Sequence, residues 1–210
     1  MRNLPAAAQF ADRFHQSDAV IDAARSLASE FHCAPLGATS THVLSMLTRL
    51  ARPASAIDVG TGTGVSAVTI LSAMPPGGVL TTIDTDPQRQ AVVPELFDVA
   101  GISRHRARMI AGQSQNVLSR LAEKSYDLVF LDTDPVNHLE IFPMALSKLR
   151  AGGVIVVNNA MAAGAVANPA DRSATTSATR RMLTYVSEVP NTERVLLPVD
   201  AGLLALIRAD

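Results

Sequence analysis

A glycine-rich turn that follows an acidic residue carries the strongest chemical signal in this sequence. The turn reads Asp58-Val59-Gly60-Thr61-Gly62-Thr63-Gly64 and comes directly after a short apolar run. Glycines between a strand and a helix adopt positive φ and let the backbone approach a ligand closely. Ligands of open α/β sheets bind beyond the carboxyl ends of the strands, where such a turn would lie. We therefore expect a small-molecule site at residues 60–64.

Asp84 offers a second polar group to the same site. It ends the next apolar run, residues 79–83, and parallel strands place their carboxyl ends at one edge of the sheet. A carboxylate in this position can accept hydrogen bonds from ribose hydroxyls. The turn and Asp84 together predict a ligand that contains adenosine.

A dinucleotide is one candidate for that ligand. Its fingerprint requires glycines at the first, third and sixth positions, so that pyrophosphate can rest on the helix N-terminus. Counted from Gly60, the sixth residue is Val65, and counted from Gly62 it is Ala67. The pattern fails narrowly, since an alanine is sometimes allowed in the last place. A nicotinamide-dependent oxidoreductase therefore remains an alternative.

Asp58 distinguishes between the two ligand classes. A carboxylate just before the turn would repel pyrophosphate, but it would attract the ammonium group of a methionine-type cofactor. The nearby hydroxyls of Thr61, Thr63 and Ser66 could donate hydrogen bonds to the carboxylate of that cofactor. These residues favour a cofactor that joins adenosine to methionine.

The elements that must position these residues alternate along the chain. Strands are expected at 55–59, 79–83, 107–110, 127–131, 154–157, 194–198 and 203–207, and helices at 17–31, 40–49, 65–73, 87–100, 115–122 and 139–150. Apolar strands between helices indicate a parallel sheet covered on both faces. A turn at Asp200-Ala201-Gly202 joins the last two strands as a hairpin. Residues 160–175, rich in Ala, Gly, Pro and Asn, are expected to form a mobile loop beside the site.

Composition and charge narrow the class of protein. The 210 residues are 48% hydrophobic and 18% charged, as in one globular domain over 1–210. The net charge is −1 and the densest basic run, 104–108, is short, so no nucleic-acid partner is expected. No apolar run approaches the roughly 18 residues of a membrane span, and the first residues do not resemble a signal peptide. The single cysteine, Cys33, fits a reducing cytoplasm.

With these residues in hand, the chain resembles the catechol and caffeoyl-CoA O-methyltransferase-like family from Leu36 to its C-terminus. The matching segments follow the family order: Leu36-Gly37, the turn at 58–66, Ile83-Asp84-Thr85-Asp86-Pro87, Ile110-Ala111-Gly112-Gln113-Ser114-Gln115, Leu131-Asp132-Thr133-Asp134, Gly152-Gly153-Val154-Ile155 and Leu197-Pro198-Val199. Each motif is weak alone, but their order and spacing together are specific.

The resemblance implies a Rossmann-like class I methyltransferase, an α/β fold with a seven-stranded, mostly parallel sheet, a C-terminal antiparallel hairpin and helices on both faces. Residues 1–52 would supply helices that cover the cofactor, and 53–210 the core. The cofactor would be S-adenosylmethionine, held by Leu36, Gly37, Asp58, Gly60, Thr61, Gly62, Ser66, Asp84, Thr85, Gln113, Ser114 and Asp132. The protein would pair as a homodimer and methylate a hydroxyl oxygen of a small molecule.

Two departures from the family pattern concern the chemical half of the site. The family binds a divalent metal through an Asp and a later Asp-Asn pair, and the corresponding residues here are Asp132, Asn158 and Asn159. Hard cations prefer anionic oxygen, so the amide at 158 weakens the site, although the three side chains and water could still complete a weak Mg²⁺ site. The position of the catalytic lysine holds Pro135, which cannot transfer a proton.

Another base must therefore deprotonate the acceptor. Asp132, at the mouth of the fourth strand, is the first candidate. His138 is the second, because the reference pKa of histidine, about 6.5, suits proton transfer, and Asp134 is the third. A further alternative is a cofactor-binding protein whose catalytic half has decayed, which Pro135 and Asn158 would explain.

Overall fold

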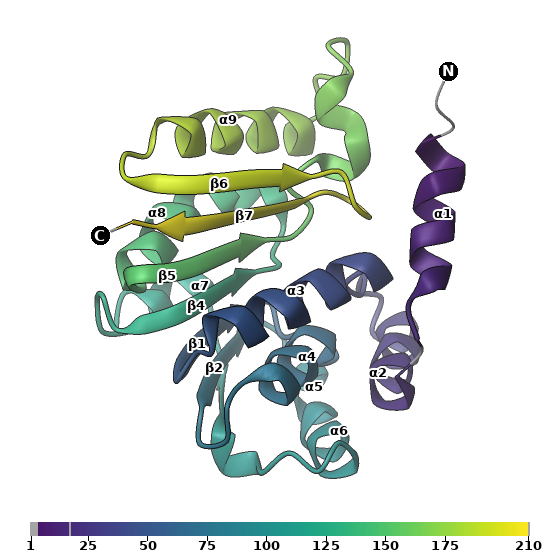
Figure 1. Ribbon diagram of the computed structural model, residues 1–210, viewed down its shortest axis with the longest axis vertical. Coiled ribbons are helices and arrows are strands. Elements are labelled where there is room, and N and C mark those ends of the chain that lie inside the picture. Colours follow the sequence, from purple (N-terminus) through teal and green to yellow (C-terminus); the bar gives the residue numbers. More distant parts are fainter. Residues whose placement is uncertain (1–3, 17, 210) are drawn as a thin grey trace.

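A seven-stranded sheet forms the centre of the computed structural model, which describes residues 4–16 and 18–209 (Figure 1). Its strands are β1 (Ser55–Val59), β2 (Val79–Asp84), β3 (Ala107–Ala111), β4 (Tyr126–Leu131), β5 (Leu149–Val157), β6 (Thr192–Leu197) and β7 (Leu203–Arg208). They are ordered β3-β2-β1-β4-β5-β7-β6. Strands β1 to β5 run parallel, whereas β7 is antiparallel to both β5 and β6. The predicted fold and its terminal hairpin are confirmed.

Helices cover both faces of this sheet. They are α1 (Leu4–Phe14), α2 (Ala19–Glu30), α3 (Ala38–Ala51), α4 (Val65–Ala73), α5 (Pro87–Ala91), α6 (Val93–Val99), α7 (Ser114–Leu118), α8 (His138–Lys148) and α9 (Ala174–Glu188). Side chains of α2, α3, α4 and α6 form one core with alternate residues of the strands. Those of α7, α8 and α9 form a second core with the other alternate residues. Strand β4 has side chains in both cores and is buried along its whole length, as expected of a central parallel strand.

Two helices were not predicted from the sequence. Helix α9 buries Thr176, Thr179, Met182 and Val186 along one face, a helical spacing in which threonines take the place of large apolar residues. Helix α1 is short and rich in alanine, and Phe10 and Phe14 are exposed on it. In both helices small alanine or threonine side chains make up much of the apolar face, which weakens the pattern by which helices are recognised in a sequence.

The segment 160–175, where the sequence predicts a loop, contains helical turns and the first residues of α9. Residues Ala162–Ala167 form short 3-10 turns that are separated by a kink at Ala163 and Gly164, where φ is positive. The guanidinium of Arg180, on α9, donates to the carbonyl oxygens of Ala165, Val166 and Asp171. One long-range cation thus holds the segment, and a local reading of the sequence could not detect it.

Other boundaries differ by a few residues. The helix expected at 87–100 is divided at Val92, two residues before Pro94, into α5 and α6, because a proline inside a helix removes a hydrogen bond and clashes with the preceding turn. Asp18 caps α2 through the backbone N–H groups of Val20 and Ile21, so this helix begins later than the predicted start at Ser17. Ser17 itself lies outside the described residues.

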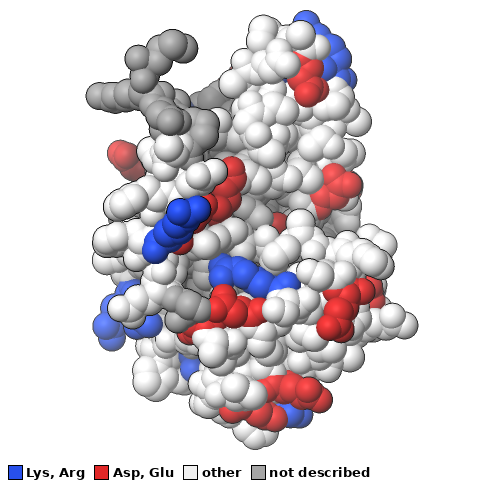
Figure 2. All heavy atoms as spheres, turned by 90° about the vertical axis from the view of Figure 1, so that its right-hand side faces the viewer, with Lys and Arg blue, Asp and Glu red and all other residues white. Residues whose placement is uncertain are grey.

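Among the described residues, neither the charges on one face of the molecule (Figure 2) nor the helices indicate a nucleic-acid-binding face or a membrane span. On the face seen in Figure 2, acidic and basic side chains are scattered among uncharged ones and form no continuous basic area. Within the described ranges, no helix combines the length and the hydropathy that crossing a membrane would require.

The parallel strands bring the chemically interesting residues together. Strands β1, β2, β4 and β5 end at the same edge of the sheet. The glycine turn, Asp84, Asp132 and Asn158 lie at these four strand ends. Residues separated by about 100 positions in the sequence therefore share one site.

Candidate functional site

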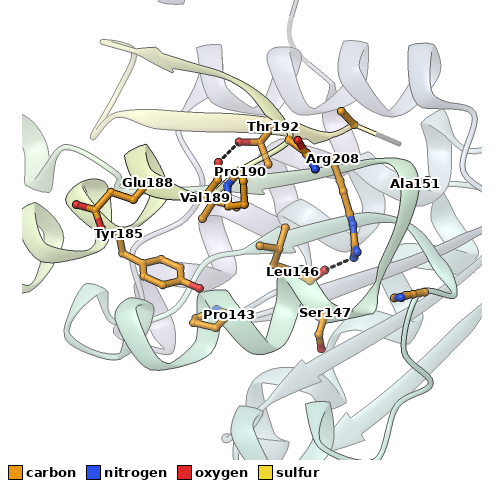
Figure 3. A pocket seen from close by; sticks show the side chains of 13 residues that line it. Pro143, Leu146, Ser147, Ala151, Tyr185, Glu188, Val189, Pro190, Thr192 and Arg208 are labelled. Carbon is orange, nitrogen blue, oxygen red and sulfur yellow. Dashed lines mark hydrogen bonds between the residues drawn. The ribbon is translucent and has the colours of Figure 1, made fainter.

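A cavity of about 780 Å³ lies at the opposite edge of the sheet from the glycine turn (Figure 3). Leu146 of α8, Tyr185 of α9 and Arg208 of β7 are among the residues that line it. Arg208 donates to the carbonyl oxygens of Leu146 and Leu149, at 3.4 and 3.0 Å. This cavity is near the amino ends of β4 and β5, whereas ligands of open α/β sheets bind at the carboxyl ends. The position of this cavity therefore does not favour it as the cofactor site.

A smaller cavity, of about 90 Å³, lies at the carboxyl edge and is lined by seven of the twelve residues predicted to hold the cofactor, but not by Gly37, Asp58, Thr85, Gln113 or Ser114. Its walls are the segment from Cys33 to Leu36, the glycine turn with Val65 and Ser66, and the side chains of Asp84, Arg89 and Asp132. Arg89, which sequence reasoning missed, also pairs with Asp86 at 3.3 Å. Spacing alone gave no sign that this cation faces the cavity.

The glycine turn brings β1 against the loop that follows β4. Gly60, Gly62 and Gly64 have φ values of +102°, +51° and +97°, a region that favours glycine. A Cβ atom at residue 60 would lie 1.9 Å from the carbonyl oxygen of Asp132. The backbone N–H of Asp132 donates to the carbonyl oxygen of Val59 at 2.7 Å. Glycine at position 60 thus allows Asp132 to lie directly beside the turn.

Asp84 organises the turn as well as facing the cavity. Its two carboxylate oxygens accept the N–H groups of Gly62, at 2.7 Å, and Asp86, at 2.9 Å. A carboxylate has about four lone-pair positions, so two are left for ribose hydroxyls. The N–H of Gly112 donates to the Asp84 carbonyl, which brings the segment with Gln113 and Ser114 beside it. Thr85, also predicted to bind the cofactor, is exposed.

Asp58 is fully buried behind the cavity and does not line it. One carboxylate oxygen accepts the hydroxyls of Thr82, at 2.7 Å, and Ser66, at 3.1 Å, and the other has no partner. Burial raises the pKa of Asp58 to about 7, and the charges of Asp132 and Asp84 add to this. Ser66 lines the cavity, so the structure places one hydroxyl between Asp58 and the space that a ligand would fill.

The threonine hydroxyls of the turn have partners within the protein. Thr61 shares a hydrogen bond of 2.6 Å with Thr82 and accepts one from Gln90. Thr63 donates to the carbonyl oxygen of Ala24 at 2.7 Å. These contacts fix the turn to β2, α5 and α2, which gives the two threonines a structural role in addition to any contact with a ligand.

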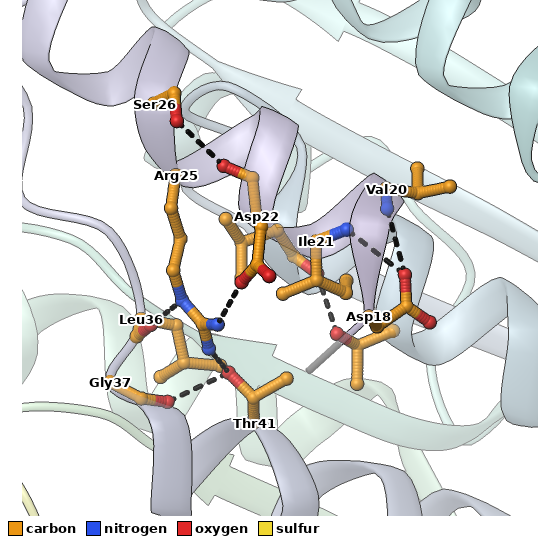
Figure 4. A network of polar contacts seen from close by, with 11 residues as sticks. Asp18, Val20, Ile21, Asp22, Arg25, Ser26, Leu36, Gly37 and Thr41 are labelled. Carbon is orange, nitrogen blue, oxygen red and sulfur yellow. Dashed lines mark hydrogen bonds and ion pairs between the residues drawn. The ribbon is translucent and has the colours of Figure 1, made fainter. Parts of the chain in front are cut away.

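The segment from Cys33 to Leu36 lines one side of the cavity, and Arg25 of α2 contacts its last residue (Figure 4). The Arg25 side chain donates to the carbonyl oxygen of Leu36, at 3.4 Å, and to the hydroxyl of Thr41, at 2.9 Å. Leu36 is 2% exposed and lines the cavity, as predicted. Gly37 is not part of the lining and lies against Asp200 instead.

Asp132 connects the cavity to the Asn158-Asn159 segment after β5. It lines the cavity, and one of its oxygens accepts the side-chain amide of Asn158 at 2.8 Å. Burial raises the pKa of Asp132 to about 6, assisted by the charge of Asp84 and opposed by the Asn158 hydrogen bond. At neutral pH such a carboxylate is mostly ionised and can still accept a proton.

The residues at the predicted metal position do not fit a tightly held divalent ion. Asp132 is the one carboxylate among them, and Asn158 turns its amide N–H toward that carboxylate rather than its oxygen. The amide oxygens of Asn158 and Asn159 are buried without partners, but both are neutral. Mg²⁺ and Ca²⁺ depend on anionic oxygen ligands. Within the described part of the chain, no group of three or more His, Cys, Asp or Glu side chains could hold a metal ion.

His138 is fully buried at the start of α8. Its Nε2 contacts the carbonyl oxygen of Thr133 at 3.0 Å, and its Nδ1 has no partner. Burial lowers the pKa of His138 to about 4, so the ring is neutral and holds the loop after β4. Asp134 is exposed and caps the 3-10 turn Pro135–Asn137 through the N–H of Val136. We therefore do not assign the base to His138 or Asp134.

Replacing the buried carboxylate of Asp58 is expected to stabilise the protein at high pH. The folded-state pKa of about 7 exceeds the unfolded value of about 3.9, so wild-type stability falls as the pH rises from about 4 through 7. Asp58→Asn should raise the free energy of unfolding by about 2–4 kcal/mol at pH 8 and much less at pH 5. Urea unfolding at the two pH values measures this, with the exposed Glu193→Gln as control. Equal effects of Asp58→Asn at both pH values would contradict the assignment.

Comparison with known proteins agrees with this geometry. The model of the O-methyltransferase family matches residues 23–209. A protein of Mycolicibacterium smegmatis whose name classes it as an O-methyltransferase is 39% identical over 198 residues, 94% of each chain. A crystal structure of a Corynebacterium glutamicum protein has a TM-score of 0.91 at 26% identity, over 100% of this chain and 98% of its own.

A second solved structure shares the fold at lower identity. The O-methyltransferase TomG of Streptomyces achromogenes, solved in complex with SAM (S-adenosylmethionine), has a TM-score of 0.84 at 23% identity, over 96% of this chain and 95% of its own. The family match and the curated relative together lead to one conclusion: this chain belongs to the O-methyltransferase family.

Proposed function

We propose that this O-methyltransferase takes its methyl group from S-adenosylmethionine, bound between the segment 33–36 and the glycine turn, and transfers it to a hydroxyl oxygen of a small molecule beside Asp132. The observation that carries the proposal is the contact of Gly60 with the Asp132 backbone. It places a carboxylate that can accept a proton at the wall of the cofactor cavity.

Charge supports this cofactor over a dinucleotide. Three carboxylates lie close together here. The charges of Asp132 and Asp84 raise the pKa of Asp58, and the charge of Asp84 raises the pKa of Asp132. A pyrophosphate would add negative charge to them, whereas the ammonium and sulfonium groups of S-adenosylmethionine are cationic. The complex of TomG with SAM supports the same choice, because that protein shares the fold.

Methyl transfer from a sulfonium requires orientation and proton removal. The acceptor oxygen attacks the methyl carbon, the carbon–sulfur bond breaks, and its electron pair passes to sulfur as S-adenosylhomocysteine leaves. The protein must align the three atoms and exclude water. Asp132 would accept the hydroxyl proton as the new bond forms, and the amide of Asn158 holds its carboxylate in place.

No lysine competes with Asp132 for this role. The sequence has two lysines, Lys124 and Lys148, which precede the amino ends of β4 and β5. Both are therefore at the opposite edge of the sheet from Asp132. Pro135, where the family has its catalytic lysine, is buried in a 3-10 turn.

We also propose that the protein works as a homodimer in the cytoplasm, with 1–52 covering the cofactor and the whole chain forming one domain. Exposed apolar side chains lie on α1, α3 and the face of the β6–β7 hairpin that α3 leaves uncovered: Phe10, Phe14, Met46, Leu50, Val195 and Ile207. Large exposed apolar side chains are candidates for an interaction surface, and a second copy would present the same apolar side chains across a twofold axis. The single Cys33 supports a reducing compartment.

Removing the proposed base should affect turnover more than binding. Asp132→Asn is expected to lower kcat about 10²–10⁴-fold, the range for general-base catalysis, with affinity for S-adenosylhomocysteine within about threefold of wild type. The assay would measure S-adenosylhomocysteine release with the best acceptor from a screen of catechols and other hydroxylated compounds. Asp134→Asn, on the same loop, is the control. Full activity of Asp132→Asn would remove it from the chemistry, and cofactor binding without turnover on any acceptor would favour a decayed enzyme.

Restoring a second carboxylate at position 158 should create a metal site. Asn158→Asp is expected to bind Mn²⁺ at least tenfold more tightly than wild type, because an added anionic ligand raises affinity for hard cations. Electron paramagnetic resonance of free Mn²⁺ measures this directly. Asn116→Asp adds the same charge at another place and serves as control. Equal, tight Mn²⁺ binding by wild type would contradict the conclusion that its donor set does not fit a divalent ion.

The proposed dimer is tested by solution mass. Light scattering after size exclusion should give twice the mass of the chain for wild type, and Phe14→Glu together with Leu50→Glu should shift it to one chain, since charged residues at an apolar interface are unfavourable. Val99→Glu changes an equally exposed apolar residue on α6 and should leave the dimer intact. A wild-type mass of one chain would refute the dimer.

A further inference from the structure

The turn between β6 and β7 touches two segments on opposite sides of the proposed site. Asp200 in this turn reaches the N-terminal end of α3, which continues from the segment covering the cofactor cavity. The neighbouring residues Ala201 and Gly202 hold the backbone that follows Asn159. The mechanism above uses neither contact.

Asp200 supplies a cap that α3 lacks. The N-cap residue of α3 is Gly37, which has no side chain to accept a hydrogen bond, and the first N–H groups of a helix require partners from outside the helix. An Asp200 carboxylate oxygen accepts the N–H of Ser40 at 2.7 Å, across 160 residues of sequence. Its negative charge is also favourable at a helix N-terminus.

Gly37 makes room for this carboxylate. Its φ of −64° is available to any residue, so the backbone conformation does not require glycine there. A Cβ at residue 37 would lie 2.1 Å from the Asp200 carboxyl carbon. A side chain at position 37 would therefore have to displace the Asp200 carboxylate.

The other side of the same turn fixes the segment after the Asn158-Asn159 pair. The N–H groups of Ala160 and Met161 donate to the carbonyl oxygens of Gly202, at 2.9 Å, and Ala201, at 3.1 Å. Gly202 has a φ of +96°, and a Cβ there would lie 2.4 Å from that of Met161. This packing leaves little freedom for one segment to move without the other.

The cavity beneath the covering segment is small for the proposed cofactor. The cavity beneath residues 33–36 has a volume of about 90 Å³, whereas ligand sites are typically about 300–1,000 Å³. We therefore expect a cofactor of nucleoside and amino acid to push this segment, and with it the start of α3, outward. The Ser40–Asp200 hydrogen bond connects that movement to the hairpin turn.

We propose that Asp200 is a positioning residue that couples the cofactor-covering segment to residues 159–163, so that cofactor binding orders the acceptor side of the site. The inference rests on the cofactor position proposed above. It goes further by assigning a residue outside the cavity lining to communication between the two halves of the reaction.

Hydrogen exchange with and without S-adenosylhomocysteine tests the coupling. In wild type, the ligand should slow exchange at both 33–41 and 159–163. In Asp200→Ala the protection should persist at 33–41 and be lost at 159–163, while calorimetry shows about fivefold weaker binding. Fivefold corresponds to ~1 kcal/mol, the typical effect of losing an N-cap. Asp200→Asn should retain part of the protection, because its amide oxygen still accepts the Ser40 N–H.

Gly37→Ala provides a second variant with Asp200 present, since its methyl group displaces the carboxylate. Like Asp200→Ala, it should lose the ligand-induced protection from hydrogen exchange at residues 159–163. Glu193→Gln removes a charge from β6, away from α3, and should match wild type. The coupling is overturned if both Asp200→Ala and Gly37→Ala keep wild-type protection at 159–163, or if wild type protects 33–41 alone. Absence of any ligand binding to wild type would instead overturn the proposed cofactor site, and the coupling with it.

Discussion

The close approach of Gly60 to the Asp132 backbone is the constraint on which the rest of the site depends. Adjacent parallel strands bring their carboxyl ends together, but a side chain at residue 60 would push the loop after β4 away from the turn after β1. With glycine there, the turn that would carry the cofactor and the carboxylate that would receive the proton share one wall. A backbone contact thus determines where the two halves of the reaction meet.

Burying several carboxylates near one cavity is electrostatically unfavourable, and a cationic cofactor would reduce that cost. Three carboxylates lie around one small cavity, and two of them, Asp58 and Asp132, have raised pKa values chiefly because they are buried. Hydroxyl and amide donors from Thr82, Ser66 and Asn158 offset only part of that burial. A cationic ligand would lower both pKa values and stabilise the ionised forms. The carboxylates therefore favour the cationic groups of a sulfonium amino acid, while Arg89 in the same lining is paired with Asp86.

Sequence reasoning predicted the strands and the glycine turn well, because both depend on local patterns of apolar and small residues. It could not predict that the hydroxyl of Thr63 is bound to Ala24 or that His138 is fully buried, since those facts depend on helices packed from elsewhere. Helix α9 was missed because threonines form much of its buried face. Asp58 was predicted to hold the cofactor, whereas in the structure it does not line the cavity and accepts a hydrogen bond from Ser66, which does.

The hairpin turn between β6 and β7 likewise combines a local pattern that the sequence reveals with long-range contacts that it does not. Its sequence, Asp200-Ala201-Gly202, predicted a reversal of the chain and nothing more. Only the folded structure shows Asp200 at the start of α3 and Gly202 beneath Met161. Polar contacts between residues far apart in the chain produce no periodic pattern in the sequence, so pattern analysis cannot predict them.

A crystal structure with S-adenosylhomocysteine tests the central claim most directly. We expect the ribose hydroxyls on Asp84, the amino group on the Ser66 side above Asp58, and the sulfur facing Asp132 across the glycine turn. A nucleoside bound in the cavity between α8, α9 and β7, with Asp84 and Asp132 free of ligand, would contradict the proposed site.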